Sequence, residues 1–393
     1  MSSLSPNQRQ NTTTHTSEHI GVCGFDVSST SPCLAELVLE HSVSAEGSDC
    51  STVRSTGSSI APPNELALYN ASPTFSHIQW RILPLLLDAL KQQGLAEQVA
   101  PGVHAFLTKK ALEGSIHEML KTKQLNALLE ILSEHQIPVI LLKGTAFSNW
   151  LYNEKVPRLS SDLDILVRSC DWDKTVAILS STMTREAKPV AGVFDDLYEI
   201  SFKSKSDTLS VEIDLHQHLT HPSLFDIDLD GVWARSIMHP AYQNEYARMM
   251  TVSDALIHQA LHSFKDAEYK TYNLIDTAFL LRKEPPELDA LFALAKSQRA
   301  DVALYGLLIK LADATHDEVL TTYLADCNIS RWRKFAFKHL SSKQVSSHDV
   351  LNKTLRYRLL QLGFHAFVST KPWSMLKLQL LYLKGLFRRS KYN

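Results

Sequence analysis

Residues 158–167 read Arg-Leu-Ser-Ser-Asp-Leu-Asp-Ile-Leu-Val, a stretch that combines a strand pattern with a pair of acids. Asp162 and Asp164 alternate with apolar residues, which is typical of a strand with one buried face. Side chains two positions apart project from the same face, so we expect the two carboxylates side by side with Leu163 beneath them. Adjacent carboxylates repel each other unless a cation lies between them, so the pattern predicts a metal site. Because like charges repel, removal of either acid is expected to leave folding stability unchanged or slightly raised.

A short apolar run at 137–142 precedes this strand and ends at a lysine and a glycine. The run predicts a buried strand followed by a tight turn, with a helix starting directly afterwards at about 145–152. Such a turn presents backbone N–H groups and a helix N-terminus to an anion, and a glycine lets a phosphate approach closely. We therefore expect the phosphates of a nucleotide to be bound by Lys143, Gly144, Thr145, Arg158 and Ser160.

Two further strands are predicted downstream, at 197–203 and 209–215, and the second alternates apolar with polar residues. Its Asp214 offers a third carboxylate, although Glu212 lies on the same predicted face and competes for that role. Carboxylate groups suit hard divalent cations such as Mg²⁺ or Mn²⁺, which keep positions for phosphate oxygens. Three carboxylates beside a phosphate turn indicate two-metal phosphoryl-type transfer.

The order of these motifs resembles the polymerase-β-like nucleotidyltransferase superfamily, and within it a widespread, largely uncharacterised bacterial family. The resemblance rests on "leucine, lysine, glycine" at 142–144, on arginine followed by aspartate-x-aspartate at 158–164, and on "aspartate, leucine, histidine" at 214–216. It covers roughly residues 105–285. We expect a catalytic core within about 137–216.

The resemblance implies particular roles for these residues. Gly144 and Thr145 would form the phosphate turn, Asp162 and Asp164 the metal pair, and Asp214 the third carboxylate in preference to Glu212. The implied activity is transfer of a nucleoside monophosphate from a nucleoside triphosphate to an unknown acceptor, with release of pyrophosphate. Thr145 departs from the Gly or Ser of the superfamily, so nucleotide binding follows from the resemblance more directly than turnover does.

Two other functions remain open at this point. One is a non-catalytic binding module or antitoxin-like regulatory partner built on the same fold, which the intact carboxylates argue against. The other is a template-free nucleic-acid polymerase, although the sequence lacks an aromatic RNA-binding signature. Metal-dependent nucleotide affinity would separate an enzyme from a pure interaction module.

Histidines near these motifs have both structural and functional interpretations. His258 and His262 are four residues apart on a predicted helix, a spacing that can bind zinc, but Gln259 stands where a metalloprotease has its Glu. The pair therefore predicts a structural role or a wall of the site. Asp276 is expected to act as a helix cap or an ion-pair partner.

A second group of histidines lies at the end of the predicted strand that carries Asp214. His216 shares the predicted face of Asp214 and is expected to orient a substrate. His216 and His218 lie on or just past the strand and His221 precedes Pro222, so the three histidines make a poor metal cage.

The composition is that of a globular protein. The 393 residues are 44% hydrophobic and 21% charged, enough for two packed domains. No run approaches the roughly 18 apolar residues of a transmembrane segment, and the N-terminus lacks the pattern of a secretory signal, so we expect a cytoplasmic protein. Its five cysteines are irregularly spaced and are expected to be free thiols.

The chain divides into three predicted parts of an α+β fold. Residues 1–73 are rich in Ser, Thr, Asn, Pro and Gly and are expected to be disordered. Residues 76–230 are predicted to form the nucleotidyltransferase core, a small mixed sheet with a helical lead-in at about 76–90 and 103–135. Residues 231–393 are predicted to form a helical domain, since everything after about Val232 has helical periodicity. The active site is expected between the last two parts.

The C-terminal tail is strongly basic. Residues 331–393 contain 14 Lys or Arg and one acid, a net charge of +13, whereas the whole chain carries −2. From Trp373 to Phe387 the tail predicts a basic amphipathic helix with apolar residues Leu376, Leu380 and Leu383. We expect it to dock on the acidic body of the chain, and the alternative is an anionic partner, a membrane surface or nucleic acid.

Overall fold

The computed structural model describes residues 80–92, 94, 96, 101–152, 156–186, 198–205, 211–266, 269–339, 364–365, 368–374, 376–377 and 380. The segment 1–73, predicted to be disordered, lies outside these residues. So do Leu383 and Phe387 of the predicted tail helix.

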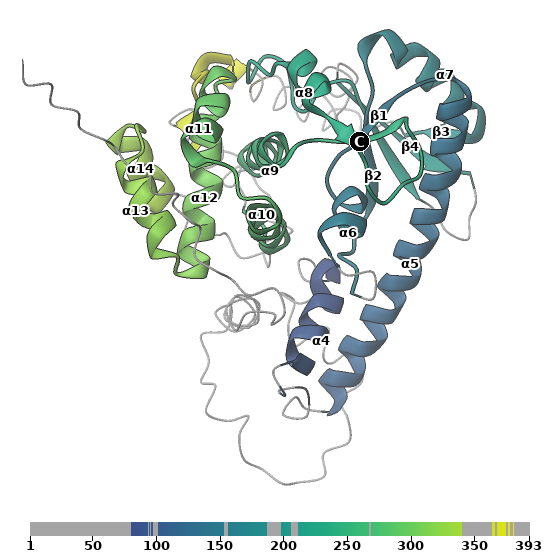
Figure 1. Ribbon diagram of the computed structural model, residues 1–393, viewed down its shortest axis with the longest axis horizontal. Coiled ribbons are helices and arrows are strands. Elements are labelled where there is room, and N and C mark those ends of the chain that lie inside the picture. The colour runs from purple at the N-terminus through teal and green to yellow at the C-terminus, as the bar shows by residue number, and fades with distance from the viewer. Residues whose placement is uncertain are drawn as a thin grey trace, which may run out of the picture.

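A helical lead-in precedes the sheet, as predicted. A short 3₁₀ turn, η2 (Trp80–Ile82), leads into α4 (Leu83–Gln92), and a long helix, α5 (Pro101–Glu134), follows. Pro84 is tolerated because it lies in the first turn of α4, where its missing N–H costs no helical hydrogen bond. The apolar face of α4 is buried and contacts α5. In Figure 1 α5 runs along the side of the sheet and α4 lies beside its first turns.

The described residues form a seven-stranded mixed sheet with the order β3-β4-β5-β2-β1-β7-β6. The pairs β2–β5 and β1–β7 are parallel, and the other neighbours are antiparallel. The strands are β1 (Val139–Leu141), β2 (Asp162–Leu166), β3 (Met183–Arg185), β4 (Glu199–Ser204), β5 (Glu212–His216), β6 (Ile237–Met238) and β7 (Ala247–Met249).

The four predicted strands correspond to β1, β2, β4 and β5, but the expectation that everything after Val232 is helical is wrong. Both β6 and β7 lie after that residue and complete the sheet, with Val139 of β1 paired to Ala247 of β7. These strands have two and three residues, too few to produce a period-two pattern. The predicted boundary at 230–231 therefore falls before the last two strands of the sheet.

The remaining helices cover the sheet and extend away from it. Figure 1 shows α9 and α10 between the sheet and the group α11 to α14, and α12 contacts α9, α10, α11, α13 and α14. The bounds are η4 (Ser169–Asp171), α6 (Thr145–Leu151), α7 (Trp172–Thr182), α8 (Leu229–Arg235), α9 (Val252–Asp266), α10 (Thr271–Lys283), α11 (Leu288–Ser297), α12 (Asp301–Thr315), α13 (Glu318–Asp326) and α14 (Arg331–His339).

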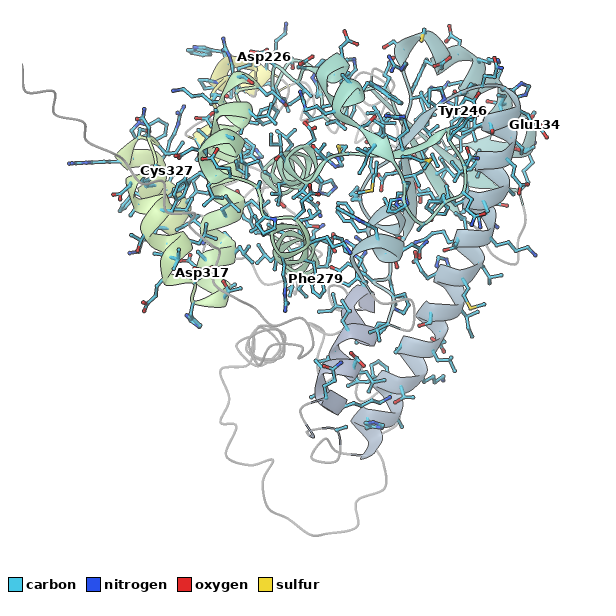
Figure 2. All side chains as sticks on the ribbon, in the orientation of Figure 1. Glu134, Asp226, Tyr246, Phe279, Asp317 and Cys327 are labelled. Atoms are coloured by element: carbon cyan, nitrogen blue, oxygen red, sulfur yellow. The ribbon has the colours of Figure 1, made fainter. Side chains whose placement is uncertain are left out.

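Part of the basic tail packs on the body of the protein. Phe364 and Val368 are buried, and His365 Nε2 lies 2.6 Å from the carbonyl oxygen of Phe264 on α9. Lys371 pairs with Asp226, an acid that Figure 2 labels at the upper edge of the molecule. Further along the tail, the exposed fraction is 81% for Trp373 and 54% for Leu380. Among the described helices, none is long and apolar enough to cross a bilayer.

Candidate metal and nucleotide site

The parallel pairing of β2 with β5 brings the predicted acids together. Asp164 lies directly opposite Asp214, and Asp162 lies opposite Glu212. His216 follows Asp214 by two positions, so it projects from the same face of β5. The alternation of apolar and polar residues on both strands buries Leu163 and Ile213 beneath this face. The sequence pattern that predicted the strands therefore also determines which side chains meet.

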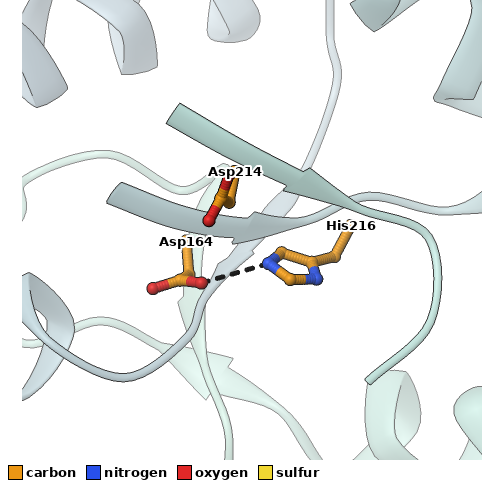
Figure 3. Close-up of side chains that lie close together, drawn as sticks. All are labelled: Asp164, Asp214 and His216. Carbon is orange, nitrogen blue, oxygen red and sulfur yellow. Dashed lines mark hydrogen bonds and ion pairs between the residues drawn. The ribbon is translucent and has the colours of Figure 1, made fainter. Parts of the chain in front are cut away.

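Asp164 is the most buried acid of the group, with 5% of its surface exposed. Its Oδ1 lies 3.1 Å from His216 Nε2 (Figure 3) and 3.3 Å from Lys143 Nζ. Burial by itself raises the pKa of this carboxyl, but Lys143 and His216 outweigh burial and hold the pKa well below its usual range. Asp164 Oδ2 is also buried and has no hydrogen-bond partner within the described part of the chain.

Asp214 has the opposite electrostatic environment. Burial, followed by the neighbouring charges of Asp164 and Glu199, raises the pKa of its carboxyl to about 7. Ser201, its register partner on β4, donates a short hydrogen bond to Asp214 Oδ1 and opposes this shift. A cation placed between Asp164 and Asp214 would relieve the repulsion that burial intensifies.

The donor set fits a divalent cation. Asp164, Asp214 and His216 each offer one ligand atom, and these atoms lie within 4.8 Å of one another. A coordination sphere is roughly 4 to 5 Å across, twice a typical metal–ligand distance. The buried oxygen Asp164 Oδ2, which lacks a hydrogen bond, is the kind of atom that a cation would satisfy. Figure 3 shows the three side chains close together on two adjacent strands, which are β2 and β5.

This cluster differs from the predicted one in two residues. Asp162 is not a member of it. Its Oδ1 accepts a hydrogen bond of 3.0 Å from the Ser161 hydroxyl. His216 was expected to orient a substrate, and it is the third member of the cluster. The signal available in the sequence was its two-residue spacing from Asp214.

A cavity of about 180 Å³ opens beside the cluster. The sheet contributes Asp162 and the three cluster residues to its lining, and α9 contributes His258 and His262 on the other side. The spacing of these two histidines predicted a structural role or a wall of the site, and both line the cavity. Lys143 connects the two sides, because its Nζ lies 3.1 Å from His262 Nε2 and also contacts Asp164.

The predicted phosphate turn lies, as expected, between the end of a strand and the start of a helix. Lys143 and Gly144 follow β1, and α6 begins at Thr145. Gly144 has φ +66°, a conformation that favours glycine, and a Cβ at this position would be tightly packed at 3.0 Å from Ser160 Cβ. Of the predicted phosphate-binding residues, Lys143 lines the cavity.

Arg158 and Ser160 have buried partners away from the cavity lining. The Arg158 guanidinium donates to both oxygens of Asp276, at 2.8 and 3.2 Å, and the Tyr152 hydroxyl donates to the same carboxylate. The ion-pair role expected of Asp276 is confirmed. Ser160 accepts a hydrogen bond from the buried Lys121 ammonium through its carbonyl oxygen, at 2.8 Å.

A large part of the sequence matches a known protein family. Residues 77–314, more than half of the chain, match a family described as "Uncharacterised nucleotidyltransferase". The chain belongs to this family. The matched region contains every residue of the cluster and of the cavity lining, and membership in a nucleotidyltransferase family supports a transferase.

Solved structures similar to this nucleotidyltransferase family member include one of an antigenic protein. It is titled "Crystal structure of an antigenic nucleotidyltransferase-like protein from Paracoccidioides brasiliensis", and is 14% identical with a TM-score of 0.34. The similarity covers 50% of this chain and 91% of that chain. No curated protein matches.

Proposed function

We propose that this protein transfers a nucleoside monophosphate from a nucleoside triphosphate to a hydroxyl or phosphate group of an acceptor, with release of pyrophosphate. The observation that supports this most directly is the register of β2 and β5, which sets Asp164 opposite Asp214 at the edge of a cavity. Family membership supports the reaction class.

Each residue has a distinct task in this proposal. Asp164 and Asp214, with Asp162 at the cavity rim, would hold divalent metal, Mg²⁺ or Mn²⁺. When bound, the metal would neutralise charge on the transferred nucleotidyl group and orient the triphosphate. Lys143 and the backbone of Gly144 would bind phosphate oxygens, and the first N–H groups of α6, which starts at Thr145, would add donors to an anion bound there. Asp214 would accept the proton of the acceptor.

The cavity volume limits which part of the nucleotide it holds. At about 180 Å³ it is smaller than typical small-molecule pockets of roughly 300 to 1,000 Å³. The polar lining suits the triphosphate and its cation, so the sugar and base would lie outside this cavity. Lys143 and the paired histidines of α9 place cationic or hydrogen-bonding groups opposite the acids, which is the arrangement that a metal–triphosphate complex requires.

The test is transfer of label from nucleotide to acceptor. The full chain is incubated with each of the four NTPs labelled at the α-phosphate and with a clarified lysate, in Mg²⁺, Mn²⁺ or chelator. We expect a labelled product and pyrophosphate only with metal. Asp214→Asn should abolish both, whereas Asp173→Asn, which changes an exposed acid on α7, should not.

Nucleotide titration separates the proposal from a non-catalytic module. An enzyme of this kind should bind at least one NTP more tightly with metal than with chelator. Equal affinity in both conditions, together with no labelled product, would refute the proposed function and favour a regulatory binding partner.

A further inference from the structure

The potential metal ligands at the candidate site include an imidazole nitrogen, from His216, and the type of ligand atom affects which metal a site prefers. His216 Nε2 lies within the same 4.8 Å cluster as the oxygens of Asp164 and Asp214. All three residues are on the two central parallel strands, so their spacing is fixed by backbone pairing rather than by a loop. The inference rests on the proposed function only in assuming that this cluster is the cation site.

Two carboxylates and an imidazole favour a different class of cation from three carboxylates. Mg²⁺ binds oxygen ligands almost exclusively, whereas imidazole suits the first-row transition metals. We infer that the site formed by Asp164, Asp214 and His216 is a mixed oxygen–nitrogen site that selects a divalent transition-metal ion such as Mn²⁺, Co²⁺ or Zn²⁺ over Mg²⁺.

The surroundings of His216 place a carboxylate near its second ring nitrogen. Glu199 Oε2 lies 3.7 Å from His216 Nδ1, so a carboxylate stands behind the ring on the side opposite to Asp164. Metal-binding histidines usually hydrogen-bond a carboxylate or carbonyl through their second nitrogen. At 3.7 Å the Glu199 carboxylate is a nearby charge and not a hydrogen-bond partner, and Nδ1 has no hydrogen-bond partner within the described residues. Ser201 holds Asp214 through its hydrogen bond to Oδ1.

The structure also contains atoms that a bound cation would satisfy. Asp164 is 95% buried, and its Oδ2 has no hydrogen-bond partner within the described residues, although it belongs to a side chain that lines the cavity. Lys143 Nζ and His216 Nε2 both contact Asp164 Oδ1. A divalent cation would replace the contact between His216 and Asp164 with a shared bond to both residues.

The experiment uses the metal alone as the probe, on the full chain without nucleotide. Electron paramagnetic resonance counts bound Mn²⁺, and electron spin-echo modulation detects a directly bound ¹⁴N nucleus. We expect one histidine nitrogen on Mn²⁺ in the wild type, and Mn²⁺ affinity at least about tenfold above that for Mg²⁺.

Two variants make the test specific. His216→Gln should lose the nitrogen signal and weaken Mn²⁺ binding by at least about tenfold, while Mg²⁺ affinity changes much less. His218→Gln is the matched control, because His218 follows on the same segment but is not part of the cluster. It should retain both the signal and the affinity.

The outcomes of this experiment are independent of the proposed reaction. Mn²⁺ bound without a nitrogen signal in the wild type, or equal affinity for Mn²⁺ and Mg²⁺, would overturn the inference and leave the proposed transfer standing with oxygen ligands alone. If His216→Gln does not fold, the wild-type spectrum still decides. Failure of every NTP to bind would remove the proposed function without affecting a nitrogen signal from bound Mn²⁺.

Discussion

Asp164 on β2 and Asp214 on β5 are direct register partners in a parallel strand pair, and their carboxyl groups have pKa values shifted in opposite directions. Burial raises the pKa of both. Lys143 and His216 reverse the shift for Asp164, whereas Asp164 and Glu199 add to it for Asp214. Asp164 is thus held in its charged form, and its charge helps to raise the pKa of Asp214.

This asymmetry predicts a pH-dependent stability in chelator. The folded pKa of Asp214 is about 7, above the value of about 3.9 for an unfolded aspartate. The folded state therefore binds a proton that the unfolded state lacks between these pH values, so Asp214 makes the protein more stable as pH falls from 8 to 5. The lowered pKa of Asp164 acts only below about pH 4.

Thermal melts of wild type and Asp214→Asn at several pH values check this prediction. The neutral variant should melt higher than wild type at pH 8, and the difference should shrink toward pH 5. An identical difference at both pH values would show that Asp214 does not titrate in this range.

Asp164→Asn should destabilise the metal-free fold. The sequence predicted no loss of stability, but the structure shows that the variant would leave the largely buried Lys143 ammonium and His216 facing an uncharged group. We expect a cost of roughly 2 kcal/mol, less than for a fully buried pair because part of Lys143 remains solvated. Urea unfolding in chelator measures it.

Asp162→Asn is the control for that measurement. Asp162 is half-buried, and the Ser161 hydroxyl can donate to an amide oxygen as well as to a carboxylate. Its unfolding free energy should change by less than about 1 kcal/mol. Equal losses in both variants would contradict the contacts assigned to Asp164.

Lys143→Met should separate metal binding from nucleotide binding. The Lys143 ammonium competes with a cation for Asp164 Oδ1, so its removal should tighten nucleotide-free metal binding by about tenfold, while weakening NTP affinity by a similar factor. Calorimetric titration of metal alone and then of NTP measures both effects. A loss of both affinities would mean that Lys143 maintains the site rather than competing for it.

Arg158→Met should primarily affect stability. Arg158 was expected to bind phosphate, but the structure pairs it with Asp276 in a buried contact. Removing one partner of such a pair costs roughly 3 to 5 kcal/mol, and Arg158→Met combined with Asp276→Leu should recover part of that cost.

The comparison for Arg158 is Lys110→Met, which breaks an exposed ion pair with Glu113 and should cost less than about 1 kcal/mol. NTP affinity of folded Arg158→Met is the second measurement. A large loss of affinity with unchanged stability would restore the phosphate-binding role.

Shortening the C-terminal tail at two points should give different results. A chain ending at residue 363 loses the buried Phe364 and Val368 and the contact from His365, and should melt at least about 5 °C lower. A chain ending at residue 380 keeps those contacts and should melt within about 2 °C of the full chain. Equal melts for both would show that the tail contributes nothing to the fold.

The sequence predicted the parts of the site that depend on local periodicity. Alternation identified β2 and β5, and the glycine turn identified the start of α6, so Asp164 and Asp214 could be placed on strand faces in advance. The register that sets these two residues opposite each other depends on the parallel pairing, which no local pattern specifies.

The side-chain partners required the three-dimensional arrangement. Arg158 is the arginine of the motif at 158–164, yet its partner Asp276 lies on α10, far along the chain. In the same way, the contact between Lys143 and His262 joins the turn after β1 to α9. The spacing of His258 and His262 identified one helix face, and only packing shows that this face closes the cavity.

The late position of β7 links the site to the order in which the chain is made. β1 pairs with β7, and α9 begins at Val252 directly after that strand, so the wall carrying His258 is positioned by it. A nascent chain that has emerged only to residue 230 contains both acids, yet β1 is still an open edge prone to pairing with other strands. The two acids are therefore synthesised before the elements that complete the cavity. The cavity can form only after α9, which supplies one of its walls, has been synthesised.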